Sequence, residues 1–105
     1  MVRLAATPGE FEPANFAVFP LRELKNVYAE LTDFEANNGR FLPASIADFR
    51  VVRCWPQRTD WRAKTFHVIP ELLEQRETVD LAPGSTRQFY VIVRVPENAA
   101  PGYYQ

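Results

Sequence analysis

The sequence predicts an all-β fold, an antiparallel β-sandwich of about seven strands of the immunoglobulin or fibronectin type. Segment 86–95 alternates strictly, with Phe89, Val91 and Val93 on one face and Tyr90 on the other. This period of two is typical of a strand. The nine prolines of the chain fall mostly between the periodic segments, where strand-rich folds place their turns. With 105 residues, 47% of them hydrophobic, the chain suffices for one domain with a single core.

The first half of the chain contains four candidate strands. They cover residues 2–6, 11–19, 26–32 and 48–55. A turn at 7–10 separates the first two, and the second is apolar on both faces, so the pattern does not tell which face is inward. The third places Val27, Ala29 and Leu31 inward, and Asn37-Asn38-Gly39 then signals a turn.

The second half of the chain contains a long irregular stretch between two strand regions. Residues 56–69 show no period, and a loop of this length usually has a role or an adjoining partner. Residues 70–74 are expected to form one helical turn, and 77–81 a short strand. The turn 82–85 leads into the long strand 86–95, and residues 103–105 look like the start of a further strand. The last strand of the sandwich is therefore expected to be missing from this chain.

Charge and composition exclude several classes of function. A net charge of −1 gives no electrostatic signature of nucleic-acid or anionic-membrane binding, and no apolar run is long enough to span a membrane. Cys54 is the only cysteine, so no internal disulfide forms, and we expect it to be a small buried hydrophobe. Cys54 and His67 alone do not make a zinc site. The sequence predicts neither a metal nor another cofactor.

Three pieces of the sequence together resemble a known family. They are Gly9-Glu10-Phe11-Glu12-Pro13, Ala82-Pro83-Gly84 before the long strand, and Ala100-Pro101-Gly102-Tyr103-Tyr104. Their order and spacing are similar to the N-terminal Ig-like β-sandwich of bacterial glycoside-hydrolase-like proteins, a domain-of-unknown-function family. The resemblance covers nearly the whole chain.

The resemblance implies a non-catalytic accessory module that supports or orients an adjacent glycoside-hydrolase-like catalytic domain. Residues 1–105 would then be a single domain and a fragment of a longer multidomain protein. The implied location is secreted, periplasmic or at the cell surface. Two alternatives stay open: a carbohydrate-binding module that uses exposed aromatic side chains, and a structural or adhesion domain of the cell surface.

Four aromatic residues are the candidate sugar or interdomain contacts: Trp55, Trp61, Phe66 and Tyr90. A flat aromatic ring suits the apolar face of a pyranose, and an indole N–H can donate a hydrogen bond. Equally, Trp55 and Phe66 could close the end of the core, and Trp61 could pack on a neighbouring domain. Polysaccharide is therefore a possible partner.

No catalytic residues are assigned. Glu10 and Glu12 share a face of the expected strand, an arrangement that would suit the paired carboxylates of a glycosidase, but nothing in the sequence supplies a cleft around them. The basic cluster of Arg58, Arg62 and Lys64 is too small to indicate nucleic-acid binding. The isolated domain is accordingly expected not to be an enzyme, although its parent protein could be a glycoside hydrolase.

Overall fold

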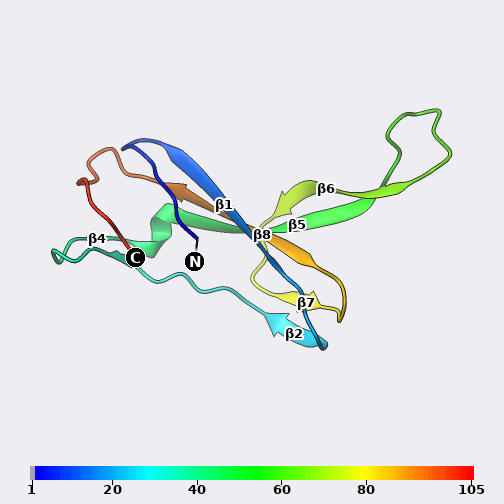
Figure 1. The fold of residues 1–105 in the computed structure, drawn as a ribbon, viewed down its shortest axis with the longest axis horizontal. Helices are drawn as coiled ribbons and strands as arrows, with labels where there is room; N and C mark the ends of the chain where they lie inside the picture. Colours follow the sequence, from blue (N-terminus) through cyan, green and yellow to red (C-terminus); the bar gives the residue numbers. More distant parts are fainter. Residues whose placement is uncertain (1) are drawn as a thin grey trace.

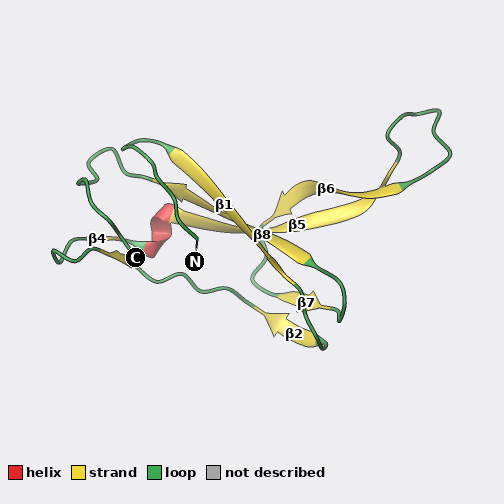
Figure 2. Ribbon diagram, in the orientation of Figure 1, coloured by secondary structure: helices red, strands yellow, loops and turns green. Residues whose placement is uncertain are grey.

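The computed structural model describes residues 2–105 and is all-β, as predicted (Figure 2). Its strands are antiparallel where they pair, and its helical content within the described residues is one 3₁₀ turn, η1 (Ala44–Ile46). The strands, in chain order, are β1 (Phe11–Val18), β2 (Leu24–Val27), β3 (Phe34–Glu35), β4 (Phe41–Leu42), β5 (Ala47–Gln57), β6 (His67–Glu74), β7 (Val79–Leu81) and β8 (Arg87–Arg94).

The main sheet has four strands in the order β1-β8-β5-β6 (Figure 1). The predicted long strand, β8, lies in its centre, because it pairs with β1 on one side and with β5 on the other. In this register Phe89 lies opposite both Phe16 and Val51. Two smaller pairs complete the fold: β2 with β7, and the hairpin β3–β4 around the predicted Asn-Gly turn.

The core lies between the main sheet and the pair β2–β7. Its centre is formed by Val51, Leu81 and Phe89, which are 2–4% exposed. The hydrophobic side chains packed around these are only partly buried: Val18, Leu24, Val27, Phe49 and Val79. The rings of Phe16 and Phe49 stack on Phe89 with centroids 5.3 and 5.4 Å away. These contacts show that the Phe16 face of β1 is the inward one, which the sequence left open.

The molecule exposes far more surface than a compact chain of its size. Its accessible area is 8396 Å², whereas a compact 12.1 kDa protein exposes roughly 6,000 Å². Its radius of gyration is 17.3 Å, against about 13 Å for a compact domain of this length. The principal extents of 56 × 34 × 21 Å describe an elongated, thin body. Much of the apolar surface is therefore left without a covering layer.

One cause of the elongation is a hairpin that leaves the sheet. Strand β5 pairs with β8 only from Ala47 to Val51, and beyond that point β6 is its one paired neighbour among the described strands. The pairing shifts register between Arg53 and Cys54, where β6 contributes an extra residue. We call residues 53–72 the arm: the outer part of β5, the loop 58–66 and most of β6. The arm projects away from the rest of the molecule (Figure 1).

Three expectations about the strands are wrong. Residues 2–6 form no strand, and their side chains are all exposed. The segment expected as a strand over 26–32 is displaced: β2 begins at Leu24 and ends at Val27, and within it Asn26 takes a left-handed φ of +52° where the pairing with β7 shifts register. Residues 70–74 are the end of β6 and not a helical turn, since pairing with β5 overrides their local preference.

The irregular stretch differs from the expectation in its limits, whereas the last residues do pair as a short extended segment. The irregular stretch is shorter than 56–69, because β5 continues to Gln57 and β6 starts at His67. At the end of the chain, Tyr104 forms an isolated antiparallel bridge with Ala36, and the backbones of Gln105 and Glu35 exchange two hydrogen bonds of 2.8 Å. Residues 103–105 thus extend the β3–β4 hairpin by a short paired segment.

Candidate functional site

The four aromatic candidates lie in two separate regions of the molecule. Trp55, Trp61 and Phe66 all belong to the arm, whereas Tyr90 lies in the centre of β8. Tyr90 is therefore separate from the other three candidates in the fold.

Tyr90 occupies the face of the main sheet that is turned away from the core. It lies opposite Asn15 of β1 and Arg50 of β5, and it is half-buried. On the same face the Arg50 guanidinium donates to the Asp48 carboxylate at 2.5–2.7 Å. Also on this face, the Arg94 guanidinium lies 5.5 Å from the ring of Phe11, which pairs with Arg94. Tyr90 is thus surrounded by a mixed polar and aromatic surface.

Trp55 lies in the part of the arm nearest the body and is half-buried. Its neighbour Arg53 places its guanidinium 5.3 Å from the Trp55 ring centroid and also donates to the Glu74 carboxylate at 2.7 Å. Arg76 contacts the other oxygen of Glu74 at 2.6 Å. These two hydrogen bonds lower the pKa of Glu74 below its ordinary value. The cation beside the Trp55 ring, Arg53, is therefore already paired with a carboxylate of the same chain.

The loop 58–66 at the end of the arm presents the most exposed aromatics of the candidate set. Trp61 is 75% and Phe66 59% exposed, so neither closes the core. The Arg62 guanidinium lies 4.5 Å from the Trp61 ring centroid, and that of Arg58 lies 5.5 Å from the Phe66 centroid. Asp60 shapes this loop, because its side chain accepts the N–H of Arg62 at 2.9 Å. We call residues 58–66 the arm tip.

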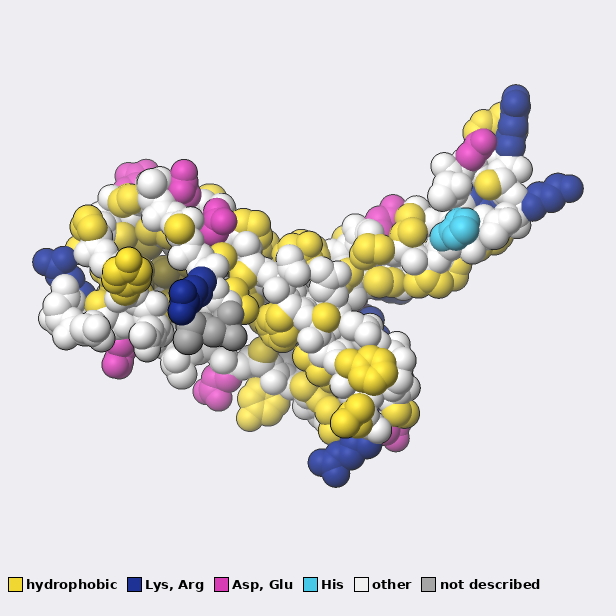
Figure 3. Space-filling model, in the orientation of Figure 1, with side chains coloured by type: hydrophobic (Ala, Val, Ile, Leu, Met, Phe, Trp, Pro, Cys, Tyr) yellow, Lys and Arg dark blue, Asp and Glu magenta, His cyan; other side chains and the backbone are white. Residues whose placement is uncertain are grey.

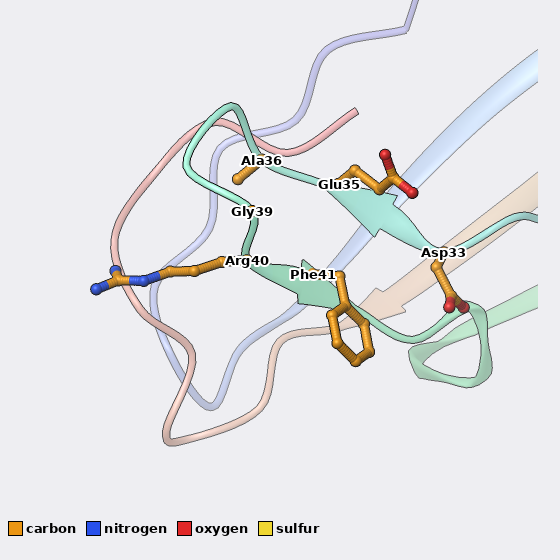
Figure 4. A pocket seen from close by; sticks show the side chains of 6 residues that line it. All are labelled: Asp33, Glu35, Ala36, Gly39, Arg40 and Phe41. Carbon is orange, nitrogen blue, oxygen red and sulfur yellow. The ribbon is translucent and has the colours of Figure 1, made fainter.

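The surface hollows lie in a different region from these aromatics. One is lined by the β3–β4 hairpin and its approaches, and its lining residues are Asp33, Glu35, Ala36, Gly39, Arg40 and Phe41 (Figure 4). A second adjoins it and includes Glu30 and Gln105. Asp33 accepts the N–H of Ala44 at 2.8 Å, which assigns it a structural task. Figure 4 shows Arg40 pointing away from the two carboxylates.

The other titratable candidates show no catalytic arrangement. Glu10 lies in a turn, and its carboxylate accepts the N–H of Thr7 at 2.8 Å, which lowers the pKa of Glu10. Cys54 is exposed rather than buried, because it comes three positions after the core residue Val51 and so lies on the opposite face of β5. Within residues 2–105 no group of three potential ligands lies close enough to hold a metal ion. In the same range, no helix is long and apolar enough to cross a membrane.

The arginine partners of the aromatics were missed by the sequence analysis. Arg53 and Trp55 are two positions apart on one strand, a spacing that places side chains on the same face. Arg62 directly follows Trp61 in a loop. The first pair was therefore visible as a pattern, whereas the pairing of Arg58 with Phe66 depends on the loop closing and has no signal in the sequence.

The comparisons with known proteins give a structural likeness to a glycoside hydrolase. No protein-family model matches the sequence, and no curated protein matches it either. The fold is similar to part of a family 123 glycoside hydrolase from Clostridium perfringens, studied for the hydrolysis of glycolipid glycans, with a TM-score of 0.81 and 16% sequence identity. The likeness covers 94% of this chain but only 18% of that chain. It shows a shared fold over a small part of a much longer protein.

Proposed function

We propose that this chain is a non-catalytic accessory β-sandwich domain that supports or orients an adjacent glycoside-hydrolase-like catalytic domain of the same polypeptide. The observation that carries the proposal is the match of nearly all of this chain to 18% of a glycoside hydrolase. Most of that enzyme lies outside the matched part, so the matched part is one module among others. A secreted, periplasmic or cell-surface location goes with this role.

The exposed surface supports a role in docking. The chain exposes roughly 2,000 Å² or more beyond what its mass requires, and interfaces between domains of one chain bury about 600–1,500 Å². Several large apolar side chains at and after strand β1 are uncovered: Phe11 is 63%, Phe19 57% and Leu21 90% exposed. An adjoining domain packed on this region would remove apolar area from water, which is favourable.

The test compares the isolated chain with the polypeptide that carries both domains. The double variant Phe11→Ala/Phe19→Ala should lower the melting temperature of the two-domain protein more than that of the isolated chain. Tyr28→Ala, which also removes an exposed aromatic side chain (71%), is the matched control and should lower neither. Equal effects of the double variant on both proteins would contradict the proposed docking. A gene that encodes no catalytic domain beside these residues would overturn the proposal as a whole.

A carbohydrate-binding module is the second candidate, and the arm tip favours it. Trp61 and Phe66 are highly exposed, and exposed flat aromatic rings are the platforms that sugars stack on. The two candidates are compatible, because the docking region at β1 and the arm tip are different parts of the molecule (Figure 1). A structural or adhesion domain has no specific observation of this kind in its favour.

A further inference from the structure

The arm tip combines open aromatic rings with arginine side chains. Trp61 has the Arg62 guanidinium near its ring, yet it remains 75% exposed, so much of the ring stays open to solvent. Phe66 has the same relation to Arg58 and is 59% exposed. Two rings with adjacent forked donors therefore lie on one short loop.

The charge of the arm tip is positive although the chain as a whole is negative. Residues 58–66 carry Arg58, Arg62 and Lys64 against a single carboxylate, Asp60, while the net charge of the whole chain is −1. Figure 3 shows Lys and Arg side chains projecting from the end of the arm. A cationic end on an anionic body attracts an anionic ligand to that end.

The two arginines of the arm tip contact aromatic rings and one backbone carbonyl, but they are not neutralised by a carboxylate of the described residues. Arg58 donates to the backbone carbonyl of Trp61 at 3.4 Å, and no carboxylate of residues 2–105 forms an ion pair with Arg58, Arg62 or Lys64. Arg50 and Arg53, nearer the body, each contact a carboxylate. The guanidinium groups at the tip thus retain N–H donors for an external acceptor.

We propose that the arm tip binds an anionic glycan, one that carries carboxylate or sulfate groups on pyranose rings. The apolar face of a pyranose stacks on the Trp61 and Phe66 rings, and Arg58 and Arg62 donate to its anionic substituents. Guanidinium groups pair with carboxylates through two parallel hydrogen bonds, which adds geometric selectivity to charge. An acidic protein surface would use the cations but not the open ring faces, so the glycan accounts for both features.

This inference rests on the carbohydrate-related role proposed above for its choice of sugar as ligand, but it needs no catalytic domain. The experiment therefore uses the 105-residue chain, shown to be folded by circular dichroism. Tryptophan fluorescence and calorimetry follow titration with polygalacturonate and heparin, with neutral dextran and poly-glutamate as comparison polymers. We expect saturable binding to polygalacturonate or heparin, no binding to dextran, and at least tenfold weaker binding to poly-glutamate.

Variants locate the site. Trp61→Ala and the double variant Arg58→Gln/Arg62→Gln should each weaken binding of the anionic glycan by about tenfold or more. Arg40→Gln and Tyr28→Ala remove a cation and an exposed aromatic elsewhere, and both should leave the affinity unchanged. The affinity of the Trp61→Ala variant is measured by calorimetry, because that substitution also removes a fluorophore.

Three outcomes would overturn the inference. Equal binding to poly-glutamate would show attraction by charge alone, as an acidic protein surface would give, and binding to dextran alone would mean that the ligand is a neutral sugar. No binding to either anionic glycan by the folded chain would exclude this ligand class. None of these results bears on the docking of a catalytic domain, which the two-domain melting experiment tests separately.

Discussion

The carboxylate of Asp80 accepts the backbone N–H of Asn26 at 2.9 Å. The bond joins β7 to β2 at the place where their pairing is irregular, since the register shifts between Leu24 and Val27. The Lys25 ammonium lies 3.5 Å from the same carboxylate. The pair β2–β7 covers the core. In a regular ladder a backbone carbonyl would accept such an N–H, whereas here the Asp80 side chain accepts it.

Replacing Asp80 tests this link. Asp80→Ala removes the acceptor of the Asn26 N–H and should lower the melting temperature. Asp80→Asn keeps an oxygen acceptor but loses the charge that favours the nearby Lys25, so its melting temperature should lie between those of Asp80→Ala and the parent chain. Thermal unfolding followed by circular dichroism measures the order. A melting temperature for Asp80→Ala equal to that of the parent would mean that the bond contributes nothing.

The left-handed conformation of Asn26 gives a second prediction. A β-branched residue is strained at a φ of +52°, so Asn26→Val should destabilise the chain by about 1–2 kcal/mol. Asn26→Gly fits this conformation and should change the free energy of unfolding by less than half as much. Urea unfolding of the two variants provides the comparison. Equal free energies of unfolding for Asn26→Val and Asn26→Gly would show that the chain can leave the left-handed conformation at this position without losing stability.

The small core predicts unusual sensitivity at Phe89. Only 3% of this residue is exposed and two phenylalanine rings stack on it, so Phe89→Ala should cost about 3–5 kcal/mol. That is a large fraction of the 5–15 kcal/mol typical of a whole domain. Tyr103→Ala, at a site that is 93% exposed, should stay within about 0.5 kcal/mol of the parent. Similar losses for both variants in urea unfolding would argue against this core.

Glu74→Gln should destabilise the pairing of β5 with β6 in the arm without destabilising the rest of the main sheet. Glu74 receives hydrogen bonds from both Arg53 and Arg76, and an amide has only one oxygen for these two donors. A hairpin of two strands is marginally stable by itself. Hydrogen exchange should therefore speed up at residues 53–57 and 67–72, while the amides of β8 keep their rates. Equal acceleration in the arm and in β8 would indicate global destabilisation instead.

Stability should fall as the pH falls below about 4.5. Hydrogen bonds from backbone N–H groups to Glu10 and Asp80, and from arginines to Glu74, lower the pKa of each carboxyl in the folded chain. The folded state thus binds fewer protons than the unfolded state. The stabilisation is fully present above the ordinary pKa values of 4.5 and 3.8, and is lost as the pH falls through the folded ones. Melting temperatures between about pH 2 and 7 test this, and a flat profile would contradict it.

The pKa of Lys25 is raised by its hydrogen bond to Glu23 and the charge of Asp80. Its contribution is fully present below the ordinary value of 10.5 and is lost as the pH rises through the raised pKa. The variant Lys25→Gln has no ammonium group to titrate at this position. Its melting temperature should therefore fall less steeply at alkaline pH than that of the parent chain.

The sequence predicted well where local pattern and tertiary pairing agree. The alternation in 86–95 predicted the strand β8 and placed Phe89, Val91 and Val93 on one of its faces, and the Asn-Gly dipeptide at 38–39 predicted the β3–β4 turn. The prediction was wrong where pairing with another strand determines the secondary structure. The segment 70–74 is a strand because β5 lies beside it, and 2–6 is not one because no partner strand is present among the described residues.

The candidate site was predicted only in part, for a related reason. Aromatic residues are visible in a sequence, but their exposure depends on whether a layer covers them. The sequence left open whether Phe66 closes the end of the core, and only the structure shows it 59% exposed at the end of the arm. Cys54 shows the same limit, because the alternation of residues 48–55 does not tell which face of the strand is covered.

Both edges of the main sheet are proline-bearing strands. Pro13 lies within β1 and Pro70 within β6, next to the register shift. Each residue lacks a backbone N–H and fixes its φ, and prolines and bulges on edge strands hinder the addition of a further strand. An elongated β-protein with this much exposed apolar surface would otherwise be prone to stacking edge to edge into fibres. The two prolines thus help the sheet to remain a finite, four-stranded unit despite its open sides.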